Sequence, residues 1–245
     1  MSKQEIIGAM FNDIAPRYDT LNHLLSLGLD KRWRRAAVRR VAAIRPAAVL
    51  DLAAGTGDMT LALLKRYLPQ RVCCADLSPE MLGRGKEKIS RRLAKRFGKK
   101  RLAQRIAPPT TEFVECTAEA LPFADESFDV VMIGFGVRNF ADIPQSMREI
   151  ARILKPSGRL VVLEFSMPRR GFFALLYRLY LRLYLPLVGG VISGSFRAYR
   201  YLPSSMQQYA RESPLLPAIE ASGLRLVEQR PLTGGTVMLT VGVRV

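Results

Sequence analysis

The sequence predicts an α/β fold in which a doubly wound, seven-stranded sheet is mostly parallel and has one antiparallel strand. From position 47 onward, short apolar segments alternate with longer amphipathic ones, the pattern of parallel strands joined by right-handed helical crossovers. Only a short link containing Gly234 and Gly235 separates the last two apolar segments, so these should pair antiparallel. With 245 residues, of which 49% are hydrophobic, the chain can bury a substantial core.

The expected elements follow the chain in order. Over residues 1–45, Ile7, Met10, Phe11 and Ile14 share one helical face and Pro16 interrupts the pattern, so we expect a helical cap over the active site. Residues 46–245 should form the main domain, with a helical insertion at 166–213. Strands are expected at 47–52, 71–76, 112–116, 128–133, 159–165, 224–230 and 237–243, helices at 59–67, 79–97 and 143–154, and a basic loop at 96–109.

The composition is strongly basic, with a net charge of +17 and a pI of about 10.4. Such charge favours an anionic partner, either nucleic acid or a phospholipid surface, although the basic blocks at 31–40 and 84–105 are equally consistent with solvated helix faces. The three cysteines have no disulfide or zinc spacing, which fits a reducing cytoplasm. We expect no secretory signal, and the uncharged stretch 183–196 is too short to span a bilayer.

The most informative motif is the turn after the first strand. Asp51 is followed by Gly55, Thr56 and Gly57, and such a turn lets a ligand approach bare backbone at the start of a helix. A dinucleotide fingerprint needs a third glycine at the position of Thr60, so the turn suits a ligand without a pyrophosphate. Asp51, Gly55, Thr56 and Gly57 are therefore candidate cofactor contacts.

A second acid, Asp76, ends the second strand, where a carboxylate can accept both hydroxyls of a ribose. The alternative is that Asp76 caps the next helix, but Ser78 is placed to do that alone. After the third strand, the segment from Thr117 and Ala118 to Phe123 precedes a strand that opens Phe-Asp-Val-Val. This succession on a Rossmann-like sheet is typical of class I methyltransferases, whose methyl donor is S-adenosyl-L-methionine (SAM).

Three further segments sharpen the resemblance. Residues 18–28 with Trp33, residues 152–166, and residues 134–139 (Gly-Phe-Gly-Val-Arg-Asn) resemble the signatures of the ubiquinone/menaquinone biosynthesis C-methyltransferase family. The resemblance implies SAM-dependent methylation of a prenylated quinol ring, with demethylmenaquinol favoured and the ubiquinone precursor as the alternative. It also implies cofactor contacts from Thr56, Asp76, Thr117, Ala118 and Gly134. Thr117 stands where the family usually has Asn, and Asp30 where it has His.

The reaction itself suggests the catalytic candidates. A quinol carbon becomes nucleophilic when a ring hydroxyl loses its proton, so a polar group is needed at that oxygen. We expect Arg138 to stabilise the phenolate and Asn139 to support it, with Tyr18 and Asp19 of the cap as further candidates. A salt bridge between Arg138 and Asp142 is an equal alternative. His23, the only histidine, is expected to be a packing or surface residue, and no metal is expected.

The insertion carries an aromatic and aliphatic helical face punctuated by arginines, which suits the headgroup region of a membrane or the wall of a prenyl tunnel. Ordinary packing against the sheet or a second subunit is the alternative. The expected partners are thus a prenylated quinol and an anionic membrane contacted peripherally at its cytoplasmic face, with a homodimer left open. RNA methylation is a distant alternative, because Phe97 is the only aromatic residue in the block 84–105.

Overall fold

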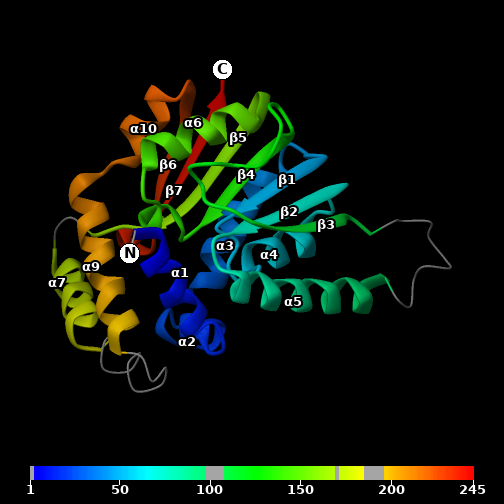
Figure 1. Ribbon diagram of the computed structural model, residues 1–245. Helices are drawn as coiled ribbons and strands as arrows, with labels where there is room; N and C mark the ends of the chain where they lie inside the picture. Colours follow the sequence, from blue (N-terminus) through cyan, green and yellow to red (C-terminus); the bar gives the residue numbers. More distant parts are fainter. Residues whose placement is uncertain (1–2, 98–107, 169–170, 185–195) are drawn as a thin grey trace.

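A seven-stranded sheet with the order β3-β2-β1-β4-β5-β7-β6 organises the molecule (Figure 1). The computed structural model describes residues 3–97, 108–168, 171–184 and 196–245. Neighbouring strands are parallel except that β7 runs antiparallel to both β5 and β6. The strands are β1 (Ala48–Leu52), β2 (Arg71–Asp76), β3 (Thr110–Glu115), β4 (Phe128–Gly134), β5 (Leu154–Phe165), β6 (Leu224–Leu232) and β7 (Val237–Arg244).

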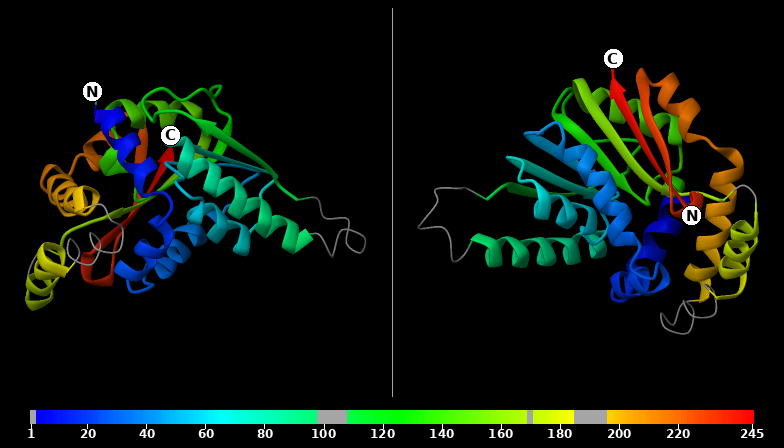
Figure 2. Two further views of the ribbon diagram at one scale, coloured as in Figure 1. Left: turned by 60° about the horizontal axis from the view of Figure 1, so that its bottom comes forward. Right: turned by 180° about the vertical axis from the view of Figure 1, so that it is seen from behind.

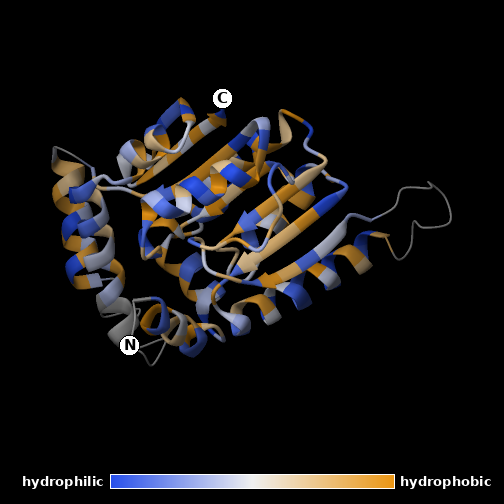
Figure 3. Ribbon diagram, turned by 45° about the horizontal axis from the view of Figure 1, so that its top comes forward, coloured by the Kyte–Doolittle hydropathy of each residue, from blue (hydrophilic) through white to orange (hydrophobic). Residues whose placement is uncertain are grey.

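Helices cover both faces of the sheet (Figure 2). On one face lie α3 (Asp30–Ala42), α4 (Asp58–Arg66) and α5 (Pro79–Phe97), and on the other α6 (Ile143–Ile153) and α10 (Leu215–Ala221). Alternate residues of β1 supply both cores: Leu50 and Leu52 pack toward α6 and α10, whereas Val49 packs toward α3 and α4. The central strands are therefore hydrophobic along most of their length, whereas hydrophobic and hydrophilic residues alternate along the helices (Figure 3).

The remaining helices gather beside the sheet. They are α1 (Lys3–Ile14) and α2 (Tyr18–Leu25) near the N-terminus, and α7 (Phe172–Leu179), the π-helix η2 (Tyr180–Tyr184) and α9 (Phe196–Glu212) between β5 and α10 (Figure 1). A separate hydrophobic cluster joins the two groups, because Leu21 and Leu25 pack with Leu181 and Met206. Two short 3-10 turns, η1 (Val137–Asn139) and η3 (Thr233–Gly235), follow β4 and β6.

The fold class predicted from the sequence is confirmed, including the antiparallel final pair. Most element bounds agree within one or two residues, and the helix expected at 79–97 is found with those bounds. β5 is longer than expected, because it begins at Leu154 directly after α6. The loop expected at 96–109 is wrong at its start, since Arg96 and Phe97 belong to α5, and its central residues 98–107 lie outside the described residues.

Candidate active site

The turn after β1 brings bare backbone to the carboxyl edge of the sheet. Gly55 and Gly57 have left-handed φ angles of 54° and 76°, a conformation that costs residues with side chains roughly 1–2 kcal/mol. A Cβ on Gly57 would lie 2.8 Å from Cδ1 of Ile89, because α5 packs directly against the turn. α4 begins at Asp58, so its first N–H groups also open toward this edge.

Asp51 lies behind the turn and has no exposed surface. Its Oδ2 accepts hydrogen bonds from the backbone N (3.0 Å) and Oγ1 (2.6 Å) of Thr60, which fixes the first turn of α4. Burial raises the pKa of Asp51 to about 7. The predicted direct contact between Asp51 and a cofactor is not what this geometry favours, because its carboxyl serves the turn from within the core.

Asp76 holds the two loops beside it. Its Oδ2 accepts a hydrogen bond from the backbone N of Gly55 at 2.7 Å, and its Oδ1 accepts one from the backbone N of Ser78 at 2.9 Å. Ser78 caps α5 by accepting a bond from the backbone N of Met81 (3.1 Å), as expected, which leaves Asp76 at the edge of the sheet. Burial raises the pKa of Asp76.

A cavity of about 80 Å³, here called the turn cavity, lies against these loops. Many of the site residues predicted from the sequence line it. They come from the ends of four strands and from the N-terminal helices, and they are Tyr18, Gly55, Asp76, Thr117, Ala118, Gly134 and Asn139. α1 covers it with Gln4, Ile7, Gly8 and Phe11. The predicted contacts Thr56, Gly57 and Asp51 do not line this cavity.

A larger cavity of about 330 Å³, here called the apolar cavity, adjoins the first. Its walls come from the N-terminal helices, from the ends of β4 and β5, and from the insertion, and most of the lining is aromatic or aliphatic: Phe11, Ile14, Trp33, Phe135, Phe165, Phe173, Leu176, Tyr177, Leu202 and Met206. Arg138 is one of its few charged lining residues.

Phe11, Tyr18 and Phe135 line both cavities. Phe135 follows β4 directly and has a left-handed φ of 65°, which is uncommon for an aromatic residue and clusters at functional sites. Burial raises the pKa of Tyr18, so its hydroxyl stays protonated and can donate a hydrogen bond at neutral pH. These three side chains therefore form the partition between the turn cavity and the apolar cavity.

Arg138 is held by an acid on the neighbouring strand. Its Nη1 donates to Oε1 of Glu164 at 2.9 Å, its backbone N to Oε2 at 3.2 Å, and a third bond goes to the carbonyl of Phe135. Its guanidinium also lies 5.2 Å from the ring centroid of Phe165. The alternative salt bridge to Asp142 is wrong, because Asp142 instead caps α6 at the backbone N of Gln145.

Asn139 and Asp19 meet different partners. The hydroxyl of Tyr201, from the insertion, donates to Oδ1 of Asn139 at 3.1 Å. Asp19 accepts bonds from Thr56 in the turn and from Nζ of Lys88 on α5, the latter at 2.5 Å. Asp19 lines neither cavity, so the structure gives no support to its predicted role as a base and makes it a link between α2 and the turn.

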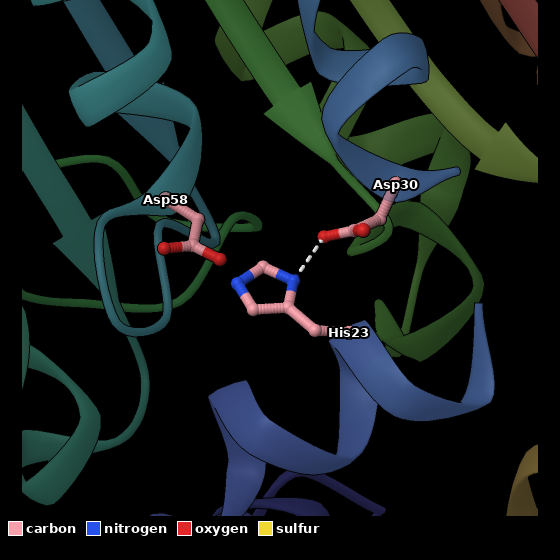
Figure 4. A group of neighbouring side chains, drawn as sticks. All are labelled: His23, Asp30 and Asp58. Carbon is pink, nitrogen blue, oxygen red and sulfur yellow. Dashed lines mark hydrogen bonds and ion pairs between the residues drawn. The ribbon is translucent and has the colours of Figure 1, made fainter. Parts of the chain in front are cut away.

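His23, Asp30 and Asp58 form a cluster whose candidate ligand atoms all lie within 4.8 Å of one another (Figure 4). Nδ1 of His23 lies 2.6 Å from Asp30, but Arg34 bonds Asp30 and lies 3.3 Å from Asp58. Lys88 is 2.8 Å from Asp58 as well. Neighbouring cations already balance both carboxylates, and we assign no metal to the cluster.

Sequence reasoning missed the partners that come from distant segments. Lys88 is one of many charges in the basic block 84–105, and no pattern in the sequence distinguishes Tyr201. One local signal was available: Gly85 interrupts a helix, and a Cβ there would lie 3.3 Å from the carbonyl oxygen of Gly55. A glycine inside a helical pattern often marks such a close backbone approach.

Known proteins share this sequence and fold. The demethylmenaquinone methyltransferase of Thermus thermophilus is 46% identical over 96% of this chain and 100% of its own length. The ubiquinone/menaquinone biosynthesis C-methyltransferase UbiE of Syntrophotalea carbinolica is 43% identical over 96% of this chain and 92% of its own. A solved SAM-dependent methyltransferase from Thermotoga maritima shares the fold, with a TM-score of 0.60 at 15% identity, covering 97% of this chain and 99% of that one.

The family model described as ubiE/COQ5 methyltransferase family matches residues 1–244, nearly the whole chain. The protein is thus an enzyme that uses SAM as its methyl donor. By its sequence, its seven-stranded sheet and its glycine turn, this chain belongs to the ubiE/COQ5 methyltransferase family.

Proposed function

We propose that this enzyme transfers a methyl group from SAM to a ring carbon of a prenylated quinol, converting demethylmenaquinol to menaquinol. The observation that carries the proposal is the pair of adjoining cavities, one against the glycine turn and Asp76 and the other apolar, with Phe11, Tyr18 and Phe135 between them. The names of the relatives from Thermus thermophilus and Deinococcus radiodurans favour the menaquinone precursor over the ubiquinone precursor.

The residues of the turn cavity fit SAM. The partly buried carboxylate of Asp76 can accept the ribose hydroxyls, Gly55 presents backbone without a side chain, and Thr117 with Ala118 stands beside the expected adenine position. Pockets for small molecules hold roughly 300–1,000 Å³, whereas this cavity holds about 80 Å³. We therefore expect α1 and Tyr18 to shift when the donor binds.

The apolar cavity suits the quinol ring and the first prenyl units. Its volume of about 330 Å³ lies within the usual range for a ligand pocket. Arg138 contributes a guanidinium to its wall, held by Glu164. The guanidinium also bonds the carbonyl of Phe135, so it lies beside a residue that belongs to both linings. An apolar surrounding strengthens the interaction of this charge with a developing phenolate.

The chemistry follows from these positions. SAM supplies an electrophilic methyl group, and a bond from that carbon to the ring forms as its bond to sulfur breaks. Arg138 stabilises the phenolate that makes the ring carbon nucleophilic, and the ring hydrogen leaves as a proton. Tyr18 lines both cavities, and its protonated hydroxyl is a second candidate to donate a hydrogen bond to the same oxygen.

Exposed apolar side chains on two segments that also line the apolar cavity support a peripheral contact with a membrane. Leu27, on the loop after α2, is 76% exposed and lines the cavity, and on α7 Phe172 and Leu175 are 75% and 63% exposed. A helix of this kind suits the interfacial region of a bilayer. No helix among the described residues is both long and apolar enough to span one.

The alternative is a homodimer formed through the same face. Detergent should dissociate such a dimer, and light scattering should then report a smaller particle.

The proposal is tested with purified enzyme, labelled SAM and a short-chain demethylmenaquinone kept reduced by dithionite. We expect label in the quinol and none when the oxidised quinone is offered, because the quinone cannot form a phenolate. A parallel assay with the methoxy-benzoquinol precursor separates the two pathways. Equal labelling of quinol and quinone, or labelling of bulk RNA instead, would contradict the proposal.

A further inference from the structure

The insertion and the far edge of the sheet enclose a second recess, here called the arginine recess. Its volume is about 660 Å³, and the only lining residue that it shares with the cavities above, among the described residues, is Phe165 of the apolar cavity. Three arginines line it, together with uncharged polar residues and apolar ones: Arg178, Arg182, Arg211, Ser166, Gln207, Tyr209, Gln229 and Thr240.

The charged side chains that line this recess in the described part of the chain are all positive. Among the described residues that line it there is no carboxylate. Arg178, Arg182 and Arg211 make no ion pair or hydrogen bond within the described part of the chain. The insertion at 166–213 contains seven arginines and a single acid, Glu212, so its excess of positive charge is already present in the sequence.

We propose that the arginine recess binds the phosphate of an anionic phospholipid headgroup. A guanidinium presents a planar fork of donors that matches phosphate oxygens in pairs. Two forks come from successive turns of one helical segment, Arg178 at the end of α7 and Arg182 in η2, and the third from Arg211 at the end of α9. Gln207, Gln229 and Thr240 add neutral donors to the same space.

The position of the recess favours a lipid phosphate over a soluble one. The helical segment that supplies Arg178 and Arg182 also presents Leu175, Leu179 and Leu183, which are 63%, 53% and 63% exposed. An interfacial helix buries its apolar face roughly 5–10 Å below the headgroups. The arginines beside that face would then lie at the depth of the phosphates. This inference rests on the proposed function, because a prenylated substrate is delivered from a bilayer.

The test compares vesicle binding of matched variants of the full chain at physiological salt. The recess variant is Arg178→Gln with Arg182→Gln and Arg211→Gln. The control removes the same charge from the exposed face of α5 by Arg84→Gln, Arg91→Gln and Arg92→Gln. For vesicles of phosphatidylcholine with phosphatidylglycerol, we expect the recess variant to bind about tenfold more weakly or worse, and the control to change by about twofold at most. A third variant with lysine at the three recess positions keeps the charge but loses the forked donors, so it should recover part of the binding, which separates lost charge from misfolding.

Several results would overturn the inference. They are equal weakening by the recess and control variants, no weakening by the recess variant, or equal binding of wild type to neutral and anionic vesicles. Calorimetry with inorganic diphosphate covers the other source of phosphate: binding that needs the three arginines, without any effect on vesicles, would assign the recess to a soluble anion. Methyl transfer to a short-chain quinol without vesicles, measured on the wild type, reports separately on the proposed function.

Discussion

Arg138 and Glu164 form a buried ion pair at the carboxyl ends of β4 and β5, with Nη1 and Oε1 2.9 Å apart and side chains 5% and 3% exposed. The pair fixes the guanidinium at the wall of the apolar cavity. A buried charge left without its partner is strongly unfavourable, so each member of the pair has its own predictable effect on stability and activity.

Glu164→Ala should lower the free energy of unfolding by about 3–5 kcal/mol, because Arg138 stays charged and buried without an acid beside it. Urea denaturation monitored by tryptophan fluorescence measures the change. Glu87→Ala is the control, since Glu87 and its partner Arg91 are 75% and 78% exposed and such pairs contribute little. A Glu164→Ala variant as stable as the control would show that the pair does not hold the site.

Arg138→Gln should reduce kcat by about 100- to 1,000-fold, the usual loss when one donor to a developing oxyanion is removed. The Kd for SAM should change little, because Arg138 lines the apolar cavity and not the turn cavity. Steady-state kinetics with a short-chain quinol and calorimetry with SAM measure the two effects. Arg148→Gln on α6, whose side chain bonds Gln145, controls for loss of one positive charge. Unchanged kcat would remove Arg138 from the chemistry.

Asp51 should make stability depend on pH with a sign opposite to that of a paired carboxylate. Its pKa rises from 3.8 to about 7 on folding, so the folded chain binds the proton more tightly than the unfolded chain in this interval. The free energy of unfolding should therefore fall as pH rises through the interval, by up to ~1.4 kcal/mol per pH unit from this group. Asp51→Asn should remove that part of the slope, and the difference between the two denaturation series isolates it. Parallel curves for wild type and variant would refute the assignment.

Gly57→Ala should destabilise the turn by roughly 1–3 kcal/mol, since the left-handed φ is unfavourable for alanine and the new Cβ would lie 2.8 Å from Ile89. Gly28→Ala is a matched control: its φ is 73°, but nothing lies within 4 Å of its Cβ position. Thermal melts of both variants compare conformational strain alone with strain plus contact. Equal melting temperatures would show that α5 moves away from the new Cβ without any loss of stability.

The sequence predicts those features of the fold and the site that depend on residues close together in the chain, and it does not predict contacts between residues that are far apart. The strands, the glycine turn, Asp76 and the pair Thr117 and Ala118 after the third strand are local patterns. Parallel strands necessarily bring their carboxyl ends to one edge. The partner of Arg138 could not be read in the same way. Asp142 is four positions away, whereas Glu164 is on the neighbouring strand, with Gly134 paired to Leu163 by the register of β4 and β5.

The same limit applies to the N-terminal helices. Asp19 has the residue type of a general base, and only the packing of α2 against the turn directs it to Lys88 and Thr56. The apolar cavity also combines three segments that are far apart in the chain, and neither its volume nor its shared wall with the turn cavity has a local signature. Composition and periodicity predict apolar faces, but not which of them enclose a space.

The most direct measurement follows a carbon-13-labelled methyl group from SAM to a short-chain demethylmenaquinol in a single turnover. We predict that NMR of the product places the label on a ring carbon, and that Phe135→Ala, which opens the partition between the cavities, lowers the yield of that product. Label found on a quinol oxygen, or on no quinol atom at all, would contradict the idea that the two cavities bring donor and ring together.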